Sequence, residues 1–152
     1  MSRNQAKIII GNDHTSIQLK QEIIKHLAEK YKIDATDCGA QGDQASDYPD
    51  YAQAVCKKLL SDGYDMGFLI CGTGAGMCIT ANKINGIRAV MCSEPYSAKL
   101  ARNHNDANIL CIGARVVGSE LAKLIIDSFI EAKFEAGRHA RRVAKIMAIE
   151  KE

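Results

Sequence analysis

Residues 65–76, DMGFLICGTGAG, are the stretch that decides the fold. The run from Asp65 to Cys71 is almost entirely apolar, which is typical of a strand buried on both faces of a parallel sheet. Glycines follow at positions 72, 74 and 76, and a helix is predicted directly after them, continuing to about Asn85. A buried strand that turns at once into a helix is the repeating unit of α/β proteins.

The same alternation of strand and helix extends along the chain in both directions. Further strands are predicted at residues 7–13, 32–39, 87–92 and 108–113. Further helices are predicted at residues 17–30, 49–60 and 94–104, from 118 onward, and in an amphipathic segment at 138–151. We therefore expect one domain over residues 1–152, a Rossmann-like three-layer α/β/α sandwich with a five-stranded parallel sheet and an extra C-terminal helix.

Composition and charge argue against several classes of protein. The 152 residues carry a net charge of +2 and only 5% aromatic residues, so no nucleic-acid partner is expected. No stretch approaches the apolar length of a membrane span, and residues 1–10 lack a signal-peptide cleavage site, so we expect a cytoplasmic protein without membrane association. The six cysteines form no CxxC pair, which favours free thiols, most of them buried, and no metal site.

The glycine loop after Cys71 admits a limited set of functions. GTGAG is not the dinucleotide fingerprint GxGxxG, and no Lys-Ser or Lys-Thr closes it as in a P-loop. Its successive backbone N–H groups favour an anion or a developing oxyanion instead. The same positive field favours a thiolate at Cys71, suited to nucleophilic attack or to proton abstraction beside a carbonyl. A tight turn beside a buried structural cysteine explains the local sequence about equally well.

Several polar residues follow strands and are expected at one rim of the sheet, where parallel sheets bind ligands. They are Asp13, His14, Cys71 and Arg115. His104 and Asn105 instead precede the fifth strand, which predicts the opposite rim. Either their loop returns toward the first group, or it serves another site, for which a neighbouring subunit is a natural candidate.

The C-terminal segment supplies cations. Arg138 and Arg142 are four residues apart, so both guanidinium groups lie on one helix face and can bind one phosphate. Arg115 and His14 offer further donors. A solvated basic face is the alternative for RHARR, but an anionic small molecule fits the whole set better than nucleic acid does.

Other polar residues are assigned structural roles. Asp47 and Asp50 are interpreted as helix-capping residues, and Ser16 as a cap of the first helix. His26 is expected at the surface. His139 is either near the phosphate or exposed, and it stays outside the catalytic set.

Taken together, the motifs resemble the type B ribose-5-phosphate isomerases, a family that also contains allose-6-phosphate isomerases and galactose-6-phosphate isomerase subunits. The resemblance extends from about Lys7 to Ile149, and residues 71–118 are its most specific part. The motifs that carry it are GNDH (11–14), DYPDYA (47–52), ICGTGAG (70–76), ANKINGIRA (81–89), CSEPYSAKLARNHNDANILCIGARVVG (92–118) and GRHARR (137–142).

The resemblance implies an aldose–ketose isomerase that opens a sugar ring and proceeds through a cis-enediolate without metal or cofactor. It implies Cys71 as the base between C1 and C2, His104 as the acid/base of ring opening, and the Thr73 hydroxyl as an enediolate contact. The implied substrate-binding residues are Asp13, His14, Gly72, Gly74, Ala75, Gly76, Asn105, Arg115, Arg138 and Arg142. The family builds its site between two protomers, so the partner is expected to be a second copy, in a homodimer or a tetramer.

Two departures from the family pattern bear on the chemistry. Some members use a glutamate just after the glycine loop in place of the cysteine, and that position here is Met77, which favours the cysteine-base subtype. Residues 15–17 (Thr-Ser-Ile) replace small and aromatic residues of the sugar pocket, which leaves pentose or hexose preference open.

Three alternatives to a ribose-5-phosphate isomerase stay open. They are a hexose-6-phosphate isomerase, a non-catalytic sugar-phosphate sensor and a thiol-redox switch at Cys71, for which Cys78 is a poor resolving partner.

Overall fold

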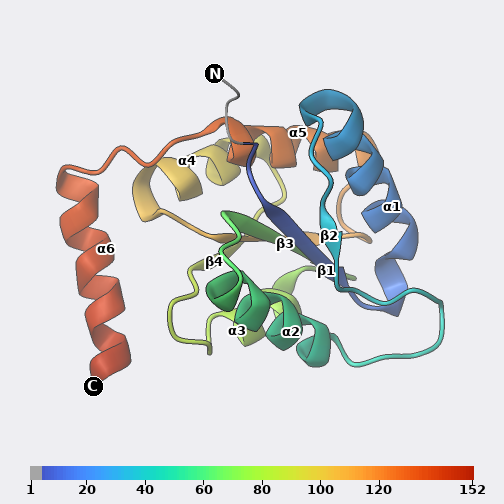
Figure 1. The fold of residues 1–152 in the computed structure, drawn as a ribbon, viewed down its shortest axis with the longest axis horizontal. Coiled ribbons are helices and arrows are strands. Elements are labelled where there is room, and N and C mark those ends of the chain that lie inside the picture. Colours follow the sequence, from blue (N-terminus) through green and yellow to red (C-terminus); the bar gives the residue numbers. More distant parts are fainter. Residues whose placement is uncertain (1–4) are drawn as a thin grey trace.

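Five parallel strands form the centre of the molecule (Figure 1). In this computed structural model, which describes residues 5–152, they lie in the order β2-β1-β3-β5-β4. Their bounds are β1 Ile8–Asn12, β2 Thr36–Asp37, β3 Met66–Cys71, β4 Ala89–Met91 and β5 Ile109–Gly113. The expected five-stranded parallel α/β fold is confirmed. Residues 1–4, part of the stretch judged to lack a signal peptide, lie outside the described residues.

Helices cover both faces of the sheet because the strand side chains alternate between two apolar cores. Ile10, Phe68 and Leu110 pack against α1 (Ile17–His26), α4 (Pro95–Asn105) and α5 (Ser119–Glu131). Leu69 and Cys111 point to the other face, which α2 (Tyr48–Ser61) and α3 (Ala75–Ala81) cover. The side on which helices lie changes between β1 and β3, and this switch point is where parallel sheets open a ligand crevice.

The last helix, α6 (Arg138–Ala148), stands apart from these layers at one end of the molecule (Figure 1). It contacts α4, and His139 is its only buried residue. Ile146 is 47% exposed, and Ile149 in the following turn (Ile149–Lys151) is 64% exposed. An amphipathic helix with its apolar side left open lacks the cover that such a face normally has.

Within residues 5–152, no helix is both long and apolar enough to cross a membrane.

Two predicted helices are shorter in the structure, and each has a local reason. α1 passes into a π-helical turn, Leu27–Tyr31, and the turn ends where Lys32 takes a left-handed φ of 59°. α3 ends at Ala81, short of its predicted end, because the Asn82 side chain donates to the carbonyl of Ala89 and accepts from its amide, both at 2.9 Å. Asn82 thus directs the chain into β4.

The predicted helix caps are only partly right. Ser16 does not cap α1; its hydroxyl donates to the Ile70 carbonyl at 2.9 Å. Asp13 caps the short 3-10 turn before it instead, accepting from the backbone N–H of residue 15. Asp47 occupies the N-cap position of α2 without a capping side-chain bond, and Asp50 lies in the first turn, where an acid is favourable.

A buried carboxylate on α5 joins it to the first helix. Asp127 contacts His26 Nε2 at 2.7 Å, Lys30 Nζ at 2.7 Å and the Tyr31 hydroxyl at 2.9 Å. Burial opposes ionisation of Asp127, but the bonds from Lys30, His26 and Tyr31 outweigh it and lower the pKa of this carboxyl. The prediction that His26 lies at the surface is therefore wrong, because this pairing across the sequence draws the ring inward.

An ion pair between a buried lysine and a carboxylate at the surface holds the segment that follows β2 against α1. Lys20 is only 2% exposed; its Nζ lies 3.0 Å from the Asp37 carboxylate and donates to the carbonyl of Ala40. Taking an ammonium group out of water is costly unless it is paired in this way. The pair thereby anchors the start of the loop that carries Ser46 to the end of β1.

Replacing Asp37 by Ala leaves the buried Lys20 charge without its partner and should lower the free energy of unfolding by about 3–5 kcal/mol. The double variant Asp37→Ala with Lys20→Met should recover most of that loss, because no charge stays buried. Urea denaturation of the two variants measures both values. A double variant as unstable as Asp37→Ala alone would contradict this account of Lys20.

Candidate functional site

The ends of β1, β3 and β5 bring one group of predicted residues to a single rim of the sheet. Asn12 pairs with Ile70 and Cys71 pairs with Gly113, so these strands end side by side. The segments that follow β3 and β5 stay paired for one more bond, since Arg115 N donates to the Gly72 carbonyl at 3.0 Å. We call this group the thiol cluster; it consists of Asp13, His14, Cys71, residues 72–76 and Arg115.

The glycine loop folds back onto the cysteine that precedes it. Gly74 has a left-handed φ of +80°, and its N–H donates to Cys71 Sγ at 3.2 Å. Cys71 is 4% exposed, so this N–H is a polar partner for a sulfur atom that water hardly reaches. The loop can lie this close because Gly113 has no side chain: a Cβ there would come within 2.6 Å of the Thr73 carbonyl group.

The rest of the loop is arranged around polar groups that face away from the core. Thr73 is exposed, and its hydroxyl accepts the Ala75 N–H at 3.2 Å, which leaves the hydroxyl proton free for another acceptor. The Tyr48 ring covers Gly76 so closely that a Cβ would lie 2.5 Å from it. Backbone N–H groups before the first helical hydrogen bond of α3 have no partner within the helix. The loop can therefore serve as a cradle for an oxyanion.

His14 and Asp13 are held at the end of β1 by side-chain bonds. His14 Nδ1 accepts the N–H of Ser46 at 3.1 Å, so the neutral ring carries its proton on Nε2. Asp13 Oδ1 accepts from both the amide and the hydroxyl of Thr15, at 3.0 and 2.6 Å. Arg115 is exposed, and its Nη1 lies 3.7 Å from the Cβ position of Gly72. This rim therefore offers several donors beside the Cys71 thiol.

A second thiol on this side of the sheet has a lowered pKa. A hydrogen bond from Cys111 lowers the pKa of Cys78 to about 7, although burial acts in the opposite direction. Burial, with the Cys78 partner, raises the pKa of Cys111. All six cysteines are free, as expected. Cys78 is partly buried and packs against the core beneath this face of the sheet.

The other predicted residues lie at the opposite rim. His104 and Asn105 end α4, and the Arg88 side chain, immediately before β4, donates to the Asn105 carbonyl at 3.2 Å. Arg138 and Arg142 lie nearby on the exposed side of α6. We call these four residues the histidine cluster. Within one chain, the structure does not bring the histidine cluster to the thiol cluster.

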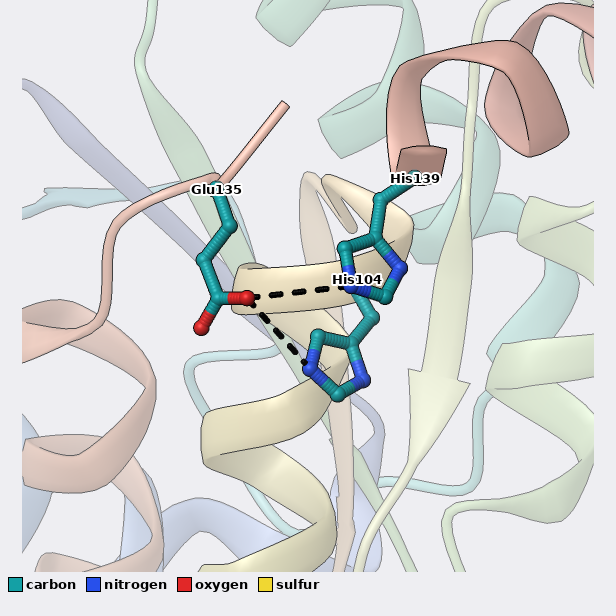
Figure 2. A group of neighbouring side chains, drawn as sticks. All are labelled: His104, Glu135 and His139. Carbon is teal, nitrogen blue, oxygen red and sulfur yellow. Dashed lines mark ion pairs between the residues drawn. The ribbon is translucent and has the colours of Figure 1, made fainter. Parts of the chain in front are cut away.

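His104 has two close neighbours that the predicted site did not include (Figure 2). Its ring stacks on that of His139 with centroids 4.0 Å apart and planes 5° from parallel. Glu135 Oε2 lies 3.7 Å from Nε2 of both rings. His139 is 6% exposed, so it is not the exposed residue that the basic segment suggested. The spacing of four between Glu135 and His139 was the available signal in the sequence.

These three residues are also the one group within residues 5–152 with donor atoms spaced for a metal ion, all within 4.8 Å of one another. An imidazole nitrogen binds a metal in the plane of its ring. Two parallel rings 4.0 Å apart cannot direct both lone pairs at one point unless they tilt. Arg138 and Arg142 add positive charge nearby. The arrangement therefore fits a carboxylate shared by two imidazoles better than a metal site.

Comparison with known proteins identifies one family for this fold. The chain matches the Ribose/Galactose Isomerase family over residues 8–146. It is 51% identical over 144 residues to ribose-5-phosphate isomerase B of Escherichia coli (strain K12), covering 95% of this chain and 96% of that protein.

Two solved structures show how close the fold is. Ribose-5-phosphate isomerase B of Clostridium thermocellum has a TM-score of 0.92 at 48% identity, covering 95% of this chain and 97% of that one. Ribose-5-phosphate isomerase B of Mycoplasma genitalium, in a crystal structure with bound ribulose-5-phosphate, has a TM-score of 0.90 at 42% identity, covering 96% of this chain and 97% of that one. With the fold, the glycine loop and this identity over nearly the whole chain in agreement, the protein belongs to the Ribose/Galactose Isomerase family.

Proposed function

We propose that this protein is an isomerase that interconverts D-ribose 5-phosphate and D-ribulose 5-phosphate, a step of the pentose phosphate pathway. The observation that carries the proposal is the contact between the Gly74 N–H and Cys71 Sγ, at 3.2 Å, in the glycine loop before α3. A thiolate next to an oxyanion cradle is suited to moving a proton beside a carbonyl. Relatives named ribose-5-phosphate isomerase B support this substrate.

The thiol cluster supplies the proton transfer. The Cys71 thiolate takes the proton from C2 of the open-chain aldose, and the electron pair moves onto O1 to form a cis-enediolate. Amides of the glycine loop and the Thr73 hydroxyl stabilise that negative charge. The cysteine returns its proton to C1, while the O2 hydroxyl proton passes to O1, which leaves the ketone at C2. No metal or cofactor takes part in these steps.

The histidine cluster supplies ring opening and part of the phosphate site. His104 takes the O1 proton of the furanose and returns it to O4 as the C1–O4 bond breaks and the C1=O1 bond forms. Arg138 and Arg142, with His14 and Arg115 from the other cluster, bind the phosphate. Asp13 and Asn105 bind sugar hydroxyls.

The two clusters lie at opposite rims of one chain, so we propose that each site combines them from two subunits of a homodimer. Exposed apolar residues on the side of β4 and α6 support a second copy as the partner. They include Ile79, Met91, Tyr96, Ile146 and Ile149. Large apolar side chains that are this exposed often lie at interfaces between proteins. Dimers of this kind can associate further into tetramers.

We further propose that the enzyme works in the cytoplasm as a single domain spanning residues 1–152. Six cysteines without a disulfide fit a reducing compartment.

A hexose 6-phosphate is the second candidate substrate, because residues 15–17 depart from the family pattern. Thr15 lies beside the loop, its Oγ1 4.0 Å from the Cβ position of Gly72. An isomerase assay with ribose 5-phosphate, allose 6-phosphate and galactose 6-phosphate separates the candidates. We expect the highest kcat/KM for ribose 5-phosphate; turnover of none of the three would favour a sugar-phosphate sensor.

Replacing Cys71 by Ala should lower kcat by about 10²–10⁴-fold, because a general base of this kind contributes that much to the rate. Binding of inorganic phosphate, measured by calorimetry, should hardly change. Cys56→Ala is the matched control, since Cys56 is another buried thiol of the same core cluster and lies outside the loop. Near-normal turnover by Cys71→Ala would show that another group is the base.

Replacing Gly74 by Ala should displace the N–H that contacts Cys71. A left-handed φ costs a residue with a side chain about 1–2 kcal/mol, and the new Cβ would lie 3.0 Å from the Ile112 backbone. We expect lower kcat and slower alkylation of Cys71, followed by peptide mass spectrometry with Cys78 as the internal reference. Gly118→Ala is the control, because its φ of −72° and open surroundings accept a side chain. Equal kcat and alkylation in the two variants would argue against the cradle.

A further inference from the structure

The segment between α5 and α6 is attached to the end of α4 beside His104. Glu135 N donates to the Asn103 carbonyl at 2.9 Å, one residue before His104. His139 N donates to the Ala136 carbonyl at 3.0 Å, which begins α6. These two bonds bring the His139 ring against the face of the His104 ring and the Glu135 carboxylate beside the Nε2 edge of both rings (Figure 2).

The chain takes an unfavourable backbone conformation to make this turn. Ala136 has a φ of +55°, as does Gly137. For alanine, the left-handed region costs about 1–2 kcal/mol. Strained residues of this kind persist where the surrounding structure over-determines them, and they concentrate at functional sites. Here the strained turn separates Glu135 from His139 and sets both against α4.

The charges divide unequally between the two stacked rings. Burial, together with the charges of His104 and Arg138, lowers the pKa of His139, although Glu135 opposes this. Arg142 acts in the same direction as Arg138. His139 is therefore a neutral aromatic surface at neutral pH, and the Glu135 carboxylate lies beside the Nε2 edge of the His104 ring.

We infer that Glu135 and His139 are positioning residues for His104: the stacked ring fixes its plane, and the carboxylate 3.7 Å from Nε2 keeps the proton of the neutral ring on that nitrogen. Nδ1 then holds the free lone pair. It is the atom that takes the O1 proton of the furanose and returns it to O4. The consequence for rate rests on the proposed function, whereas the consequence for the tautomer does not.

The first test reads the tautomer directly. The ¹⁵N chemical shifts of the imidazole rings distinguish a proton on Nε2 from one on Nδ1, and the chain has four histidines to assign. We expect the neutral His104 ring to carry its proton on Nε2 in the unaltered protein and to become a mixture of tautomers in Glu135→Gln. Glu120→Gln, which removes an exposed carboxylate paired with Lys123, is the matched control. Unchanged His104 shifts in Glu135→Gln would overturn the inference.

The second test uses kinetics. Glu135→Gln and His139→Leu should lower kcat for ribose 5-phosphate by about 10- to 100-fold, the cost of misplacing a reacting group, with KM nearly unchanged. His139→Phe should recover much of the rate, because it keeps a flat ring under His104. In a His104→Ala background, neither substitution should lower kcat further, since both act through that ring.

The outcomes separate this inference from the proposed function. An unaltered protein that turns over no sugar phosphate but shows the expected tautomer shift would refute the function and retain the positioning. An active enzyme in which Glu135→Gln lowers kcat equally with and without His104 would refute the positioning and retain the function.

Discussion

The direction of the strands is the constraint on which the rest of this structure depends. All five strands run parallel, so every strand leaves the sheet at one rim and enters at the other. Cys71 ends β3, whereas His104 precedes β5 by only a short turn. The rims lie about 17–20 Å apart, because a strand of five or six residues has that length. Loops this short cannot bring residues from one rim to the other. The two clusters are therefore separated by the fold itself, and a second subunit is the simplest way to unite them.

The same constraint accounts for the apolar residues that α6 and β4 expose, which would favour aggregation in a monomer. α6 extends beyond the layers and exposes Ile146, and the edge strand β4 leaves Met91 half exposed. Open strand edges and apolar helix faces normally need cover. In the proposed homodimer this surface is the one on which the second copy packs, so stability and catalysis depend on a single interface. The rigid parts of each cluster, the Gly74 bond to Cys71 and the His104 stack, are already formed within one chain.

Features set by local sequence were predictable, and those set by contacts across the chain were not. The sequence pattern located all five strands, although β2 is only Thr36–Asp37 within the predicted 32–39, and the glycines after Cys71 marked the turn. The end of α3 was missed because the Asn82 side chain bonds Ala89, a residue of the next strand. His26 was misplaced because Asp127, far along the chain, draws it inward. Glu135 and His139 were missed because the basic segment around them suggested a solvated face, and only the left-handed turn at Ala136 brings them onto α4.

The division of the site between subunits can be tested most directly by mixing two inactive variants. Cys71→Ala and His104→Ala homodimers each carry a lesion in every site. If each site takes Cys71 from one chain and His104 from the other, a mixed dimer contains one intact site and one doubly altered site. Random exchange of equal amounts should then restore about a quarter of the full activity, since half of the dimers are mixed. No recovery after exchange confirmed by mass spectrometry would show that Cys71 and His104 act within one chain.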